Sequence, residues 1–426
     1  MRILIVTDTF PPNVNGAALA TERLAKQLTK RGHTVSVVAP STSFKHFKRK
    51  QGDLTIYRLR SILIQKAQDF RISPQPLHAR EFKEIVREVR PDIIHINNPG
   101  FIAQTAIVVG REFHIPLVGT SHFMPENLTH YLHLPDQLEK ILNTSIWKLY
   151  AKFYGRLNLI ISPTQTAADL LKRLHVGTKV EVISNGIDLQ KFKPRNSGEY
   201  LLKRYNLPKK TTLLFVGRVD KEKNIDVLIR AVALIKNSAD FHTVIVGKGK
   251  EEKPLHKLAA ELGITENVTF TSYLPKHDLP NIYKVADIFV MPSIAELQSL
   301  VTMEAMATGL PVVGANAVAL PHLIHDNENG FLFTAGDEKD LAKKLLLLLQ
   351  DEKLRELMGK KSLEIISEHD ITKIVQKVET VYRQVIKEYQ PIGMKKQSNF
   401  PDKKMLRGLK KFIPAELMVL LLPHIK

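Results

Sequence analysis

The sequence predicts an α/β protein built from two doubly wound Rossmann-like domains that face each other across a cleft. Two observations lead to this prediction. Short apolar, β-branched segments alternate with segments of helical periodicity, which is typical of parallel sheets covered by helices. The alternation restarts near residue 211, and a chain of 426 residues is long enough for two domains. Ligands of such sheets bind at the carboxyl ends of the strands.

The first predicted domain spans residues 1–183. It opens with a buried strand at Ile3–Thr7, followed by a helix at Gly16–Lys30 whose apolar residues recur at helical spacing. The further strands expected in this domain are Val35–Ala39, Leu54–Tyr57, Ile93–Ile96, Leu117–Thr120 and Leu159–Ser162. The helices expected between them include Arg80–Arg90 and Thr164–Leu174.

A linker rich in Lys, Pro and Asn, residues 184–210, leads to the second predicted domain, residues 211–368. The strands expected there are Leu213–Gly217, Thr243–Gly247, Val268–Thr271, Ile288–Met291 and Val312–Val313. The expected helices are Asn224–Ile235, Lys253–Leu262, Leu300–Ala307 and Glu338–Leu349. A further helical segment, residues 369–390, precedes a basic amphipathic tail at 391–426.

The chain is strongly basic, with 62 Lys and Arg against 43 Asp and Glu and a formal net charge of +19. Such a chain usually meets nucleic acid, an anionic membrane or a phosphorylated ligand. The net charge is +10 over residues 1–190, +3 over 191–390 and +6 over 391–426. A nucleic-acid groove between two domains would need an excess of positive charge on both halves, so this distribution argues against a nucleic-acid-binding protein.

Composition also excludes several classes of protein. The chain has no cysteine, which excludes disulfides, a thiolate nucleophile and Cys-ligated zinc. The apolar run after Met1 stops after four residues, too few for a signal peptide. No segment approaches the roughly 18 apolar residues of a membrane-spanning helix. We therefore expect a cytoplasmic protein.

The loop after the first strand of the second domain carries two cations. Arg218 offers a planar fork that suits a phosphate, and Lys223 adds a point charge five residues later. Lys223 also directly precedes the helix start expected at Asn224, where anions are favoured. A solvated basic loop is the alternative explanation of this segment when it is taken alone.

The loop after the fourth strand of the same domain leads to two carboxylates, Glu296 and Glu304. With a helix that starts near Ser299, Glu296 precedes the helix and Glu304 lies in its second turn. Carboxylates so placed suit hydrogen bonds from separate polyol hydroxyls. The amides of Ser299, Leu300 and Val301 would point at an anion. The alternative is one surface Glu and one ordinary helical Glu.

Together these motifs resemble the retaining glycosyltransferases of the GT-B fold, the family 4 type. The resemblance covers roughly residues 1–390. Each motif alone is weak evidence for the family, but their order and spacing together are specific to it. The matching motifs are Gly217-Arg218-x-x-x-x-Lys223, the Glu296 and Glu304 pair continued by Ala-Met-Ala-x-Gly-x-Pro311, Thr7-Asp8-Thr9-Phe10-Pro11-Pro12-x-x-Asn15-Gly16, and Ser184-Asn185-Gly186-Ile187-Asp188.

The resemblance implies a role for each donor-side residue of the second domain. Arg218 and Lys223 would hold the nucleotide diphosphate and stabilise it as it leaves. Glu304 would accept hydrogen bonds from the ribose hydroxyls. Glu296 would contact hydroxyls of the transferred sugar.

Four further residues take roles from the same resemblance. The amide of Gly16 would approach the phosphates, where a residue without Cβ fits. His122, at the end of a first-domain strand, would lie near the sugar and the reacting centre. The backbone of Tyr273 and Leu274 would contact the base. A lone polar histidine at a strand end is the alternative for His122.

The implied reaction transfers a hexose from a UDP- or GDP-sugar to an acceptor hydroxyl with retention at the anomeric carbon. The sequence has no Asp-x-Asp motif, and such folds are generally metal-independent, so we expect no metal and no resident cofactor. The departing phosphate would help to take the acceptor's proton in a front-face displacement. The helix at 369–390 would cross back to the first domain, and closure would exclude water.

One departure from the family pattern points to the acceptor. Many members carry Phe-Gly where this chain has Gln298-Ser299, and the Glu-x-Gln-x-Leu form resembles diacylglycerol glucosyltransferases. The first domain of this fold binds the acceptor, and here that domain is the basic one. We therefore expect a lipid acceptor, with non-lipid acceptors of soluble or polysaccharide glycosyltransferases as the alternative.

Three segments suit a bilayer interface because they combine apolar or aromatic side chains with Lys and Arg. They are Phe44–Lys50, Ile141–Tyr154 and the tail helix expected at Lys403–Ile413. We expect a peripheral protein on the cytoplasmic face of an anionic membrane. The alternatives are a solvated loop, a core helix and a tail that packs on the protein itself.

Two hypotheses from other classes remain at this point. A nucleotide-sugar epimerase on the same two-domain fold would release sugar without an acceptor, and the two-Glu arrangement fits it less well. A nucleic-acid-binding protein is suggested only by the charge of +19, predicts steeply salt-dependent binding, and leaves the carboxylate loops unexplained.

Overall fold

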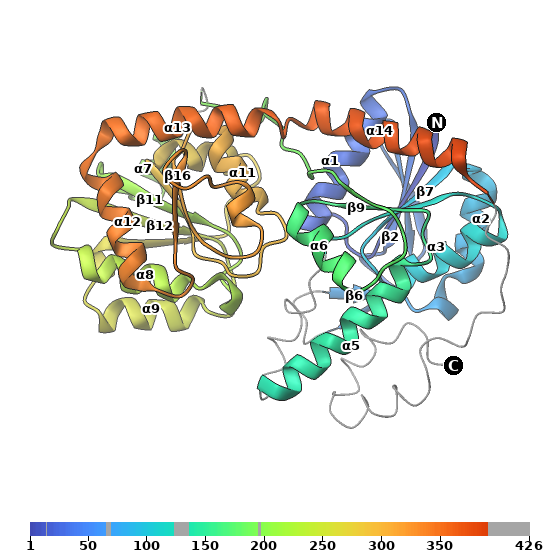
Figure 1. The fold of residues 1–426 in the computed structure, drawn as a ribbon, viewed down its shortest axis with the longest axis horizontal. Helices are drawn as coiled ribbons and strands as arrows, with labels where there is room; N and C mark the ends of the chain where they lie inside the picture. The colour runs from blue at the N-terminus through green and yellow to red at the C-terminus, as the bar shows by residue number, and fades with distance from the viewer. Residues whose placement is uncertain (14, 65–69, 123–135, 195–196, 391–426) are drawn as a thin grey trace. The chain divides into compact units, whose positions relative to one another are not determined.

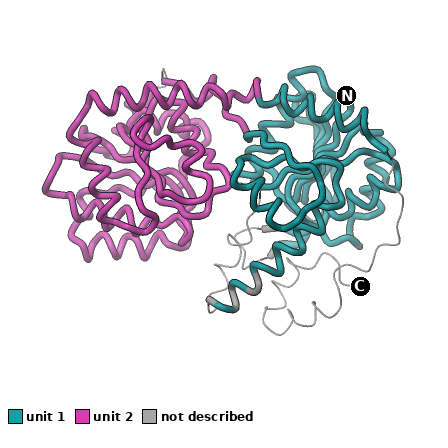
Figure 2. The backbone as a smooth tube through the Cα atoms, in the orientation of Figure 1, with its two compact units in different colours: residues 1–184, 374–426 teal, residues 185–373 magenta. Residues whose placement is uncertain are grey.

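The computed structural model describes residues 1–13, 15–64, 70–122, 136–194 and 197–390. The chain forms two compact units (Figure 2), and each has its own sheet. Among the described residues, the first unit comprises 1–184 and 374–390, and the second comprises 185–373. The prediction of two doubly wound α/β domains is confirmed. The basic tail at 391–426 lies outside the described residues.

The first unit is built on an eight-stranded sheet. Every neighbouring pair is parallel except β3 and β4, which are antiparallel. The strands, in spatial order, are β10 (Val180–Val182), β9 (Leu159–Ser162), β8 (Leu117–Thr120), β7 (Ile93–Asn97), β1 (Arg2–Thr7), β2 (Thr34–Pro40), β4 (Leu54–Leu59) and β3 (Phe47–Gln51). A separate hairpin pairs β5 (Ile62–Ile64) with β6 (Phe70–Ile72).

Helices cover both faces of this sheet, as continuously apolar parallel strands require. Ile96 of β7 belongs to the apolar core beneath α2, α3 and α5. The alternate residues His95 and Asn97 point to the other face, where they bond to Tyr382 of α14 and Thr21 of α1. The helices are α1 (Gly16–Lys30), α2 (Ala79–Val89), α3 (Phe101–Glu112), α5 (Asp136–Tyr154), α6 (Gln165–Arg173) and α14 (Ile371–Glu388).

The second unit holds a six-stranded sheet in which all pairs are parallel. Its strands, in spatial order, are β13 (Val268–Ser272), β12 (Phe241–Val246), β11 (Thr211–Val216), β14 (Ile288–Met291), β15 (Val312–Ala315) and β16 (Gly330–Phe333). Because these strands are parallel, the loops that follow β11, β12 and β14 leave the same edge of the sheet.

Two helical layers flank this second sheet. In Figure 1, α8, α9 and α12 lie on one side of β11 and β12, and α11 and α13 lie on the other. The helices of the unit are α7 (Glu199–Arg204), α8 (Ile225–Ile235), α9 (Glu252–Glu261), α10 (Leu279–Ile282), α11 (Leu300–Ala307), α12 (Glu338–Gln350) and α13 (Glu352–Ser367).

Most expected elements appear within a few residues of their predicted ends, and β8, β9, β14 and α11 match to the residue. The expected interfacial segment at 44–50 ends in strand β3, whose residues are all exposed. The segment 184–210 contains α7 and lies almost entirely in the second unit. In the part of the chain that the structure describes, every helix is too short or too polar to cross a bilayer.

Candidate functional site

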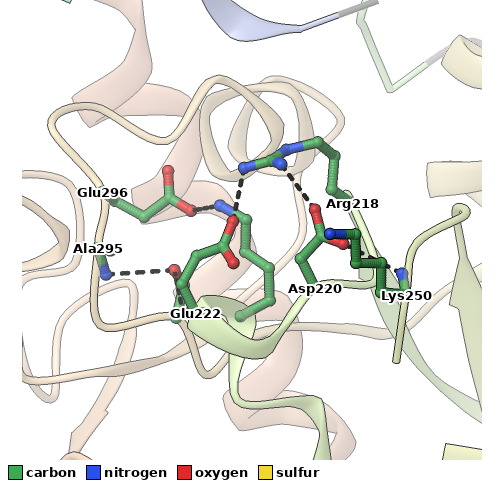
Figure 3. A network of polar contacts seen from close by, with 8 residues as sticks. Arg218, Asp220, Glu222, Lys250, Ala295 and Glu296 are labelled. Atoms are coloured by element: carbon green, nitrogen blue, oxygen red, sulfur yellow. Dashed lines mark hydrogen bonds and ion pairs between the residues drawn. The ribbon is translucent and has the colours of Figure 1, made fainter. Parts of the chain in front are cut away.

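The guanidinium of Arg218 lies between two acidic side chains at the carboxyl end of β11 (Figure 3). Its Nη1 is 2.6 Å from Oδ2 of Asp220, and its Nη2 is 2.5 Å from Oε1 of Glu222. Both carboxylates are buried, whereas the Arg218 side chain is 39% exposed. Two fixed acceptors leave the planar fork little freedom to rotate, so Arg218 is held in place with part of its surface accessible.

Asp220 also fastens this loop to the loop after β12. The amide of Lys250 donates to Oδ1 of Asp220 (3.2 Å), and the amide of Val219 donates to the carbonyl of Lys248 (2.9 Å). A Cβ at Gly249 would lie 1.9 Å from the carbonyl oxygen of Val219, so only glycine fits there. The two loops therefore form one rigid support beneath Arg218.

Lys223 and Glu296 form the second ion pair of the site. Nζ of Lys223 lies 2.5 Å from Oε1 of Glu296, and both side chains are largely buried. The carbonyl of Glu222, next to Lys223, accepts from the hydroxyl of Ser293 (3.2 Å) and the amide of Ile294 (3.3 Å). The loop after β14 is thus bonded to the loop after β11, and the two predicted donor segments lie together (Figure 3).

Glu304 is buried in the second turn of α11, as the spacing predicts. Its Oε2 accepts a hydrogen bond from the hydroxyl of Tyr283 (2.7 Å). Burial and the Glu304 carboxylate raise the pKa of Tyr283 well above its usual value, so the phenol stays protonated and donates. Tyr283 therefore fixes the orientation of this carboxylate.

Helix α11 begins where the sequence predicts. Ser299 is its N-cap residue and accepts a hydrogen bond on Oγ from the hydroxyl of Thr302 (2.8 Å). The first amide that bonds back within the helix is that of Met303, to the carbonyl of Ser299 (3.1 Å). The amides of Leu300 and Val301 belong to the first turn, where amides have no helical carbonyl four residues back and suit an anion.

The residue that departs from the family pattern has a structural partner. The side-chain carbonyl of Gln298 accepts a hydrogen bond from the amide of Asn185 (2.8 Å). This bond connects the loop of Glu296 to the Ser184–Asp188 motif, which the sequence analysis matched without locating its role.

The remaining donor-side residues follow β13. Ser272 has a φ of 58°, which turns the chain sharply after the strand. Tyr273 is 50% exposed, whereas Leu274 is buried. The exposed backbone turn leaves the same edge of the sheet as the other site loops.

Gly16 and His122 lie in the first unit, at the carboxyl edge of its sheet. Gly16 is the exposed first residue of α1, whose N-cap Asn15 accepts from the amide of Ala18 (2.9 Å). His122 follows β8 by two residues and is partly buried. Burial lowers the pKa of His122 to about 4, so its imidazole is neutral at neutral pH.

Sequence reasoning missed the acidic partners Asp220 and Glu222 and the loop at 247–250. A signal for the acids was present, since two acidic residues stand inside the Arg218-to-Lys223 motif. The loop at 247–250 carries the pattern Gly-Lys-Gly-Lys, but its contact with Val219 and Asp220 joins segments about thirty positions apart. The second unit therefore assembles held cations, two oriented carboxylates and a helix start along one sheet edge.

Comparison with known proteins decides the family. Residues 201–364 match the family model described as "Glycosyl transferases group 1", and residues 14–191 match "Glycosyltransferase Family 4". Over 378 residues the chain is 30% identical to an alpha-monoglucosyldiacylglycerol synthase of Streptococcus pneumoniae. The aligned residues cover 87% of this chain and 83% of the relative. The chain belongs to the glycosyltransferase family that these two models and this relative represent.

One further relative and one solved structure extend the comparison. The glycosyltransferase is 26% identical over 341 residues to a GDP-mannose-dependent alpha-mannosyltransferase of Corynebacterium glutamicum. The aligned residues cover 80% of this chain and 78% of the relative. The chain also resembles the structure of Anabaena HepE in complex with UDP-glucose, with a TM-score of 0.70 and 20% identity over 89% of this chain and 99% of that one. The fold is therefore the GT-B fold that the sequence analysis expected.

Proposed function

We propose that this glycosyltransferase moves a hexose, with retention, from a UDP- or GDP-sugar to a hydroxyl of a membrane lipid such as diacylglycerol. The observation that carries the proposal is the donor-side arrangement of Arg218, Lys223 and Glu296, with two held cations beside a carboxylate. The pneumococcal relative is named for monoglucosyldiacylglycerol synthesis, the Anabaena structure holds UDP-glucose, and the Corynebacterium relative uses GDP-mannose.

The proposed donor contacts follow from the charges of the site. Arg218 and Lys223 bind the diphosphate, whose remaining charge lies at the amides of Leu300 and Val301. Glu296 accepts from hydroxyls of the transferred sugar, and Glu304 accepts from the ribose. The backbone at Tyr273 and Leu274 contacts the base, and Gly16 approaches the phosphates from the first unit.

In the proposed reaction, the bond between the anomeric carbon and the diphosphate oxygen breaks as a bond to the acceptor oxygen forms on the same face. The acceptor's proton passes to the departing phosphate, so the nucleoside diphosphate leaves with that proton. Arg218 and Lys223 stabilise the charge that develops on the phosphate, and we propose that they act without a metal ion or resident cofactor. His122, neutral, lies near the transferred sugar.

The proposed lipid acceptor is supported by one corner of the first unit, which we call the β3 corner. Because β2 and β4 pair in register up to Pro40 and Leu59, the segments that follow them leave the sheet together. Four of the exposed large apolar side chains lie in or beside these segments, namely Phe44, Phe47, Ile62 and Leu63. Two exposed cations accompany them, namely Lys45 and Arg49, and Arg49 shares the strand face of Phe47.

The charge balance of the β3 corner favours an anionic bilayer. Lys48 pairs with Glu88 and Arg60 with Glu81, but Lys45 and Arg49 form no ion pair with the described residues. Apolar side chains among unpaired cations are the pattern of an interfacial surface. Each cation near an anionic leaflet contributes about 1 kcal/mol, so we propose peripheral binding to the cytoplasmic face of the membrane.

The first experiment tests the transfer itself. Purified protein is given UDP-, GDP- and ADP-sugars with diacylglycerol-containing vesicles, and the product is identified by mass and anomeric configuration. Lys223→Ala is expected to lower transfer at least roughly 100-fold, because the leaving diphosphate loses a buried counter-charge. Lys221→Ala, in the same turn but exposed, serves as the matched control and is expected to stay within about twofold.

Three outcomes would contradict the proposal. Full activity of Lys223→Ala would remove the diphosphate assignment, and loss of activity on chelation would remove metal independence. Transfer only to a soluble saccharide would replace the lipid acceptor.

The second experiment tests the membrane surface. The double variant Lys45→Glu and Arg49→Glu is expected to reduce sedimentation with vesicles that contain anionic lipid, because it reverses two charges of the β3 corner. Lys353→Glu with Lys360→Glu, both exposed on α13, makes the same charge change on the other unit and is expected to bind nearly as the wild type. Equal loss of binding in both variants would show that only net charge matters.

A further inference from the structure

A buried chain of polar groups crosses the first unit next to His122, and the proposed transfer chemistry does not use it. His95 of β7 has no exposed surface. Its Nδ1 bonds to the hydroxyl of Tyr382 from α14, and its Nε2 lies 2.6 Å from Oγ1 of Thr120 at the end of β8. The rings of His95 and Tyr382 meet edge to face, with centroids 5.6 Å apart and planes at 89°.

His95 and Tyr382 are both uncharged in this chain. Burial, and next the charge that His122 carries in its protonated form, lower the pKa of His95 to about 3, so the His95 ring is neutral and has one donor and one acceptor. Burial raises the pKa of Tyr382, which keeps its proton. The ring donates through one nitrogen and accepts at the other, so it bonds to the hydroxyls of Tyr382 and Thr120 in opposite senses.

Thr120 brings the chain to within two residues of His122. The strand continues past Thr120, because the amide of Ser121 donates to the carbonyl of Ile161 in β9 (2.9 Å). Alternate residues of a strand share a face, so Thr120 and His122 leave β8 on the side that carries His95. The electrostatic effect of His122 on His95 agrees with this placement.

We propose that His95 and Tyr382 are positioning residues that fix the end of β8 and thereby hold the imidazole of His122 at the reacting centre. The proposal rests on the function proposed above for His122. The three polar groups are buried between two strands and α14, and hydrogen-bonded side chains in such surroundings keep one orientation. Helix α14 thus supplies a part of the acceptor-domain site through Tyr382, beyond its packing.

Tyr382→Phe tests the proposal with the loss of a single oxygen atom. The expected result is a fall in kcat of roughly 10-fold, because a displaced group near the reacting atoms slows the chemistry. The KM for the nucleotide-sugar stays within about twofold, since the donor-side residues of the second unit are untouched. His95→Gln, which keeps a donor and an acceptor, is expected to retain more kcat than His95→Leu.

Glu379→Gln provides a matched control on the same helix. Glu379 of α14 accepts from Arg31 (2.7 Å) and His33 (2.8 Å), so this variant weakens a different contact between α14 and the first unit. We expect it to lower the thermal midpoint with little change in kcat. If Tyr382→Phe shows that same pattern, Tyr382 only anchors the helix and the proposal is wrong.

A readout without turnover separates this proposal from the proposed function. In full-length protein labelled with ¹⁵N-histidine, the ring signals of His122 are assigned by their loss in His122→Ala. Tyr382→Phe is expected to shift these signals, and Glu379→Gln to leave them in place. Unshifted His122 signals in Tyr382→Phe would overturn the positioning role. Shifted signals in a protein that transfers no sugar would support the geometry while removing the proposed function.

Discussion

At the scale of single residues, Asp8 carries an electrostatic cost in the folded protein. It follows β1, and its Oδ1 accepts from the amide of Ile102 at the start of α3 (3.2 Å). Its Oδ2 is buried without a hydrogen-bond partner among the described residues. Burial raises the pKa of Asp8 to about 6, although hydrogen bonds from the first amides of α3 lower it. The ionised form is therefore disfavoured in the folded state.

Asp8→Asn is expected to raise the free energy of unfolding at pH 7.5, by at most about 3 kcal/mol. The folded pKa lies above the unfolded value of 3.8, so the wild type loses stability as the pH rises from about 4 to 6. The Asn side chain does not ionise, and its carbonyl can still accept from Ile102. The measurement is urea unfolding of both proteins at pH 4.5 and pH 7.5.

The expected signature is a stability gap that is wide at pH 7.5 and narrow at pH 4.5. Asp53→Asn, in an exposed turn, serves as the control and is expected to change stability little at either pH. A less stable Asp8→Asn protein at pH 7.5 would show that the carboxylate is stabilised by contacts that outweigh its burial.

The candidate site shows which residues can be predicted from a sequence. Arg218, Lys223, Glu296 and Glu304 were placed correctly on their elements, because each lies at a fixed spacing from a strand end or helix start. The ion pair between Lys223 and Glu296 joins residues 73 positions apart. No local pattern encodes that distance, so the pairing follows only from the fold.

At the scale of elements, the rigid contact between the loops after β11 and β12 predicts a strong effect of Gly249→Ala. The new Cβ would lie 1.9 Å from the carbonyl of Val219 and 2.8 Å from Oδ1 of Asp220. Because the close atoms include backbone, the loop itself must move, and with it the support of Arg218. We expect roughly 1–3 kcal/mol of destabilisation and about 10-fold weaker binding of the nucleoside diphosphate of the proposed donor.

The measurements are thermal unfolding and calorimetric titration with UDP and with GDP. Gly177→Ala is the control, since a Cβ there would meet no atom within 4 Å. Unchanged binding of both nucleotides by a folded Gly249→Ala protein would mean that the loop contact does not position the proposed diphosphate site.

Helices and strands could be predicted where their burial requires apolar residues. Strand β14 is apolar at every position and fully buried, and its ends match the prediction. Strand β3 reads Phe-Lys-Arg-Lys-Gln, with every residue exposed, so no alternation marks it as a strand. Its formation depends on antiparallel pairing with β4 and on Lys48 lying over the ring of Tyr57, contacts that appear only once the sheet exists.

At the scale of the whole molecule, the two units differ in how the chain builds them. The second unit is one continuous segment, residues 185–373, whereas the first needs 1–184 and α14. Buried side chains of α14, among them Val375, Val378 and Tyr382, complete the first unit. We therefore expect a fragment 185–373 to unfold cooperatively by itself and a fragment 1–184 not to do so.

Circular dichroism during thermal unfolding of the two fragments checks this expectation. A synthetic peptide of residues 371–390, added to fragment 1–184, is expected to restore a cooperative transition, and the same peptide with Tyr382 and Val378 replaced by Ser is the control. Cooperative unfolding of 1–184 without peptide would show that α14 adds only local contacts.

The split of the first unit also sets an order of events on the ribosome. Domains usually fold as they emerge, the amino-terminal one first. Here the final helix of the first unit, α14, leaves the exit tunnel only after the whole second unit has been synthesised. The second unit can therefore fold before the first unit has all of its elements. During that interval the face of β7 that α14 later covers, with the polar ring of His95, lacks the helix that buries it in the folded protein.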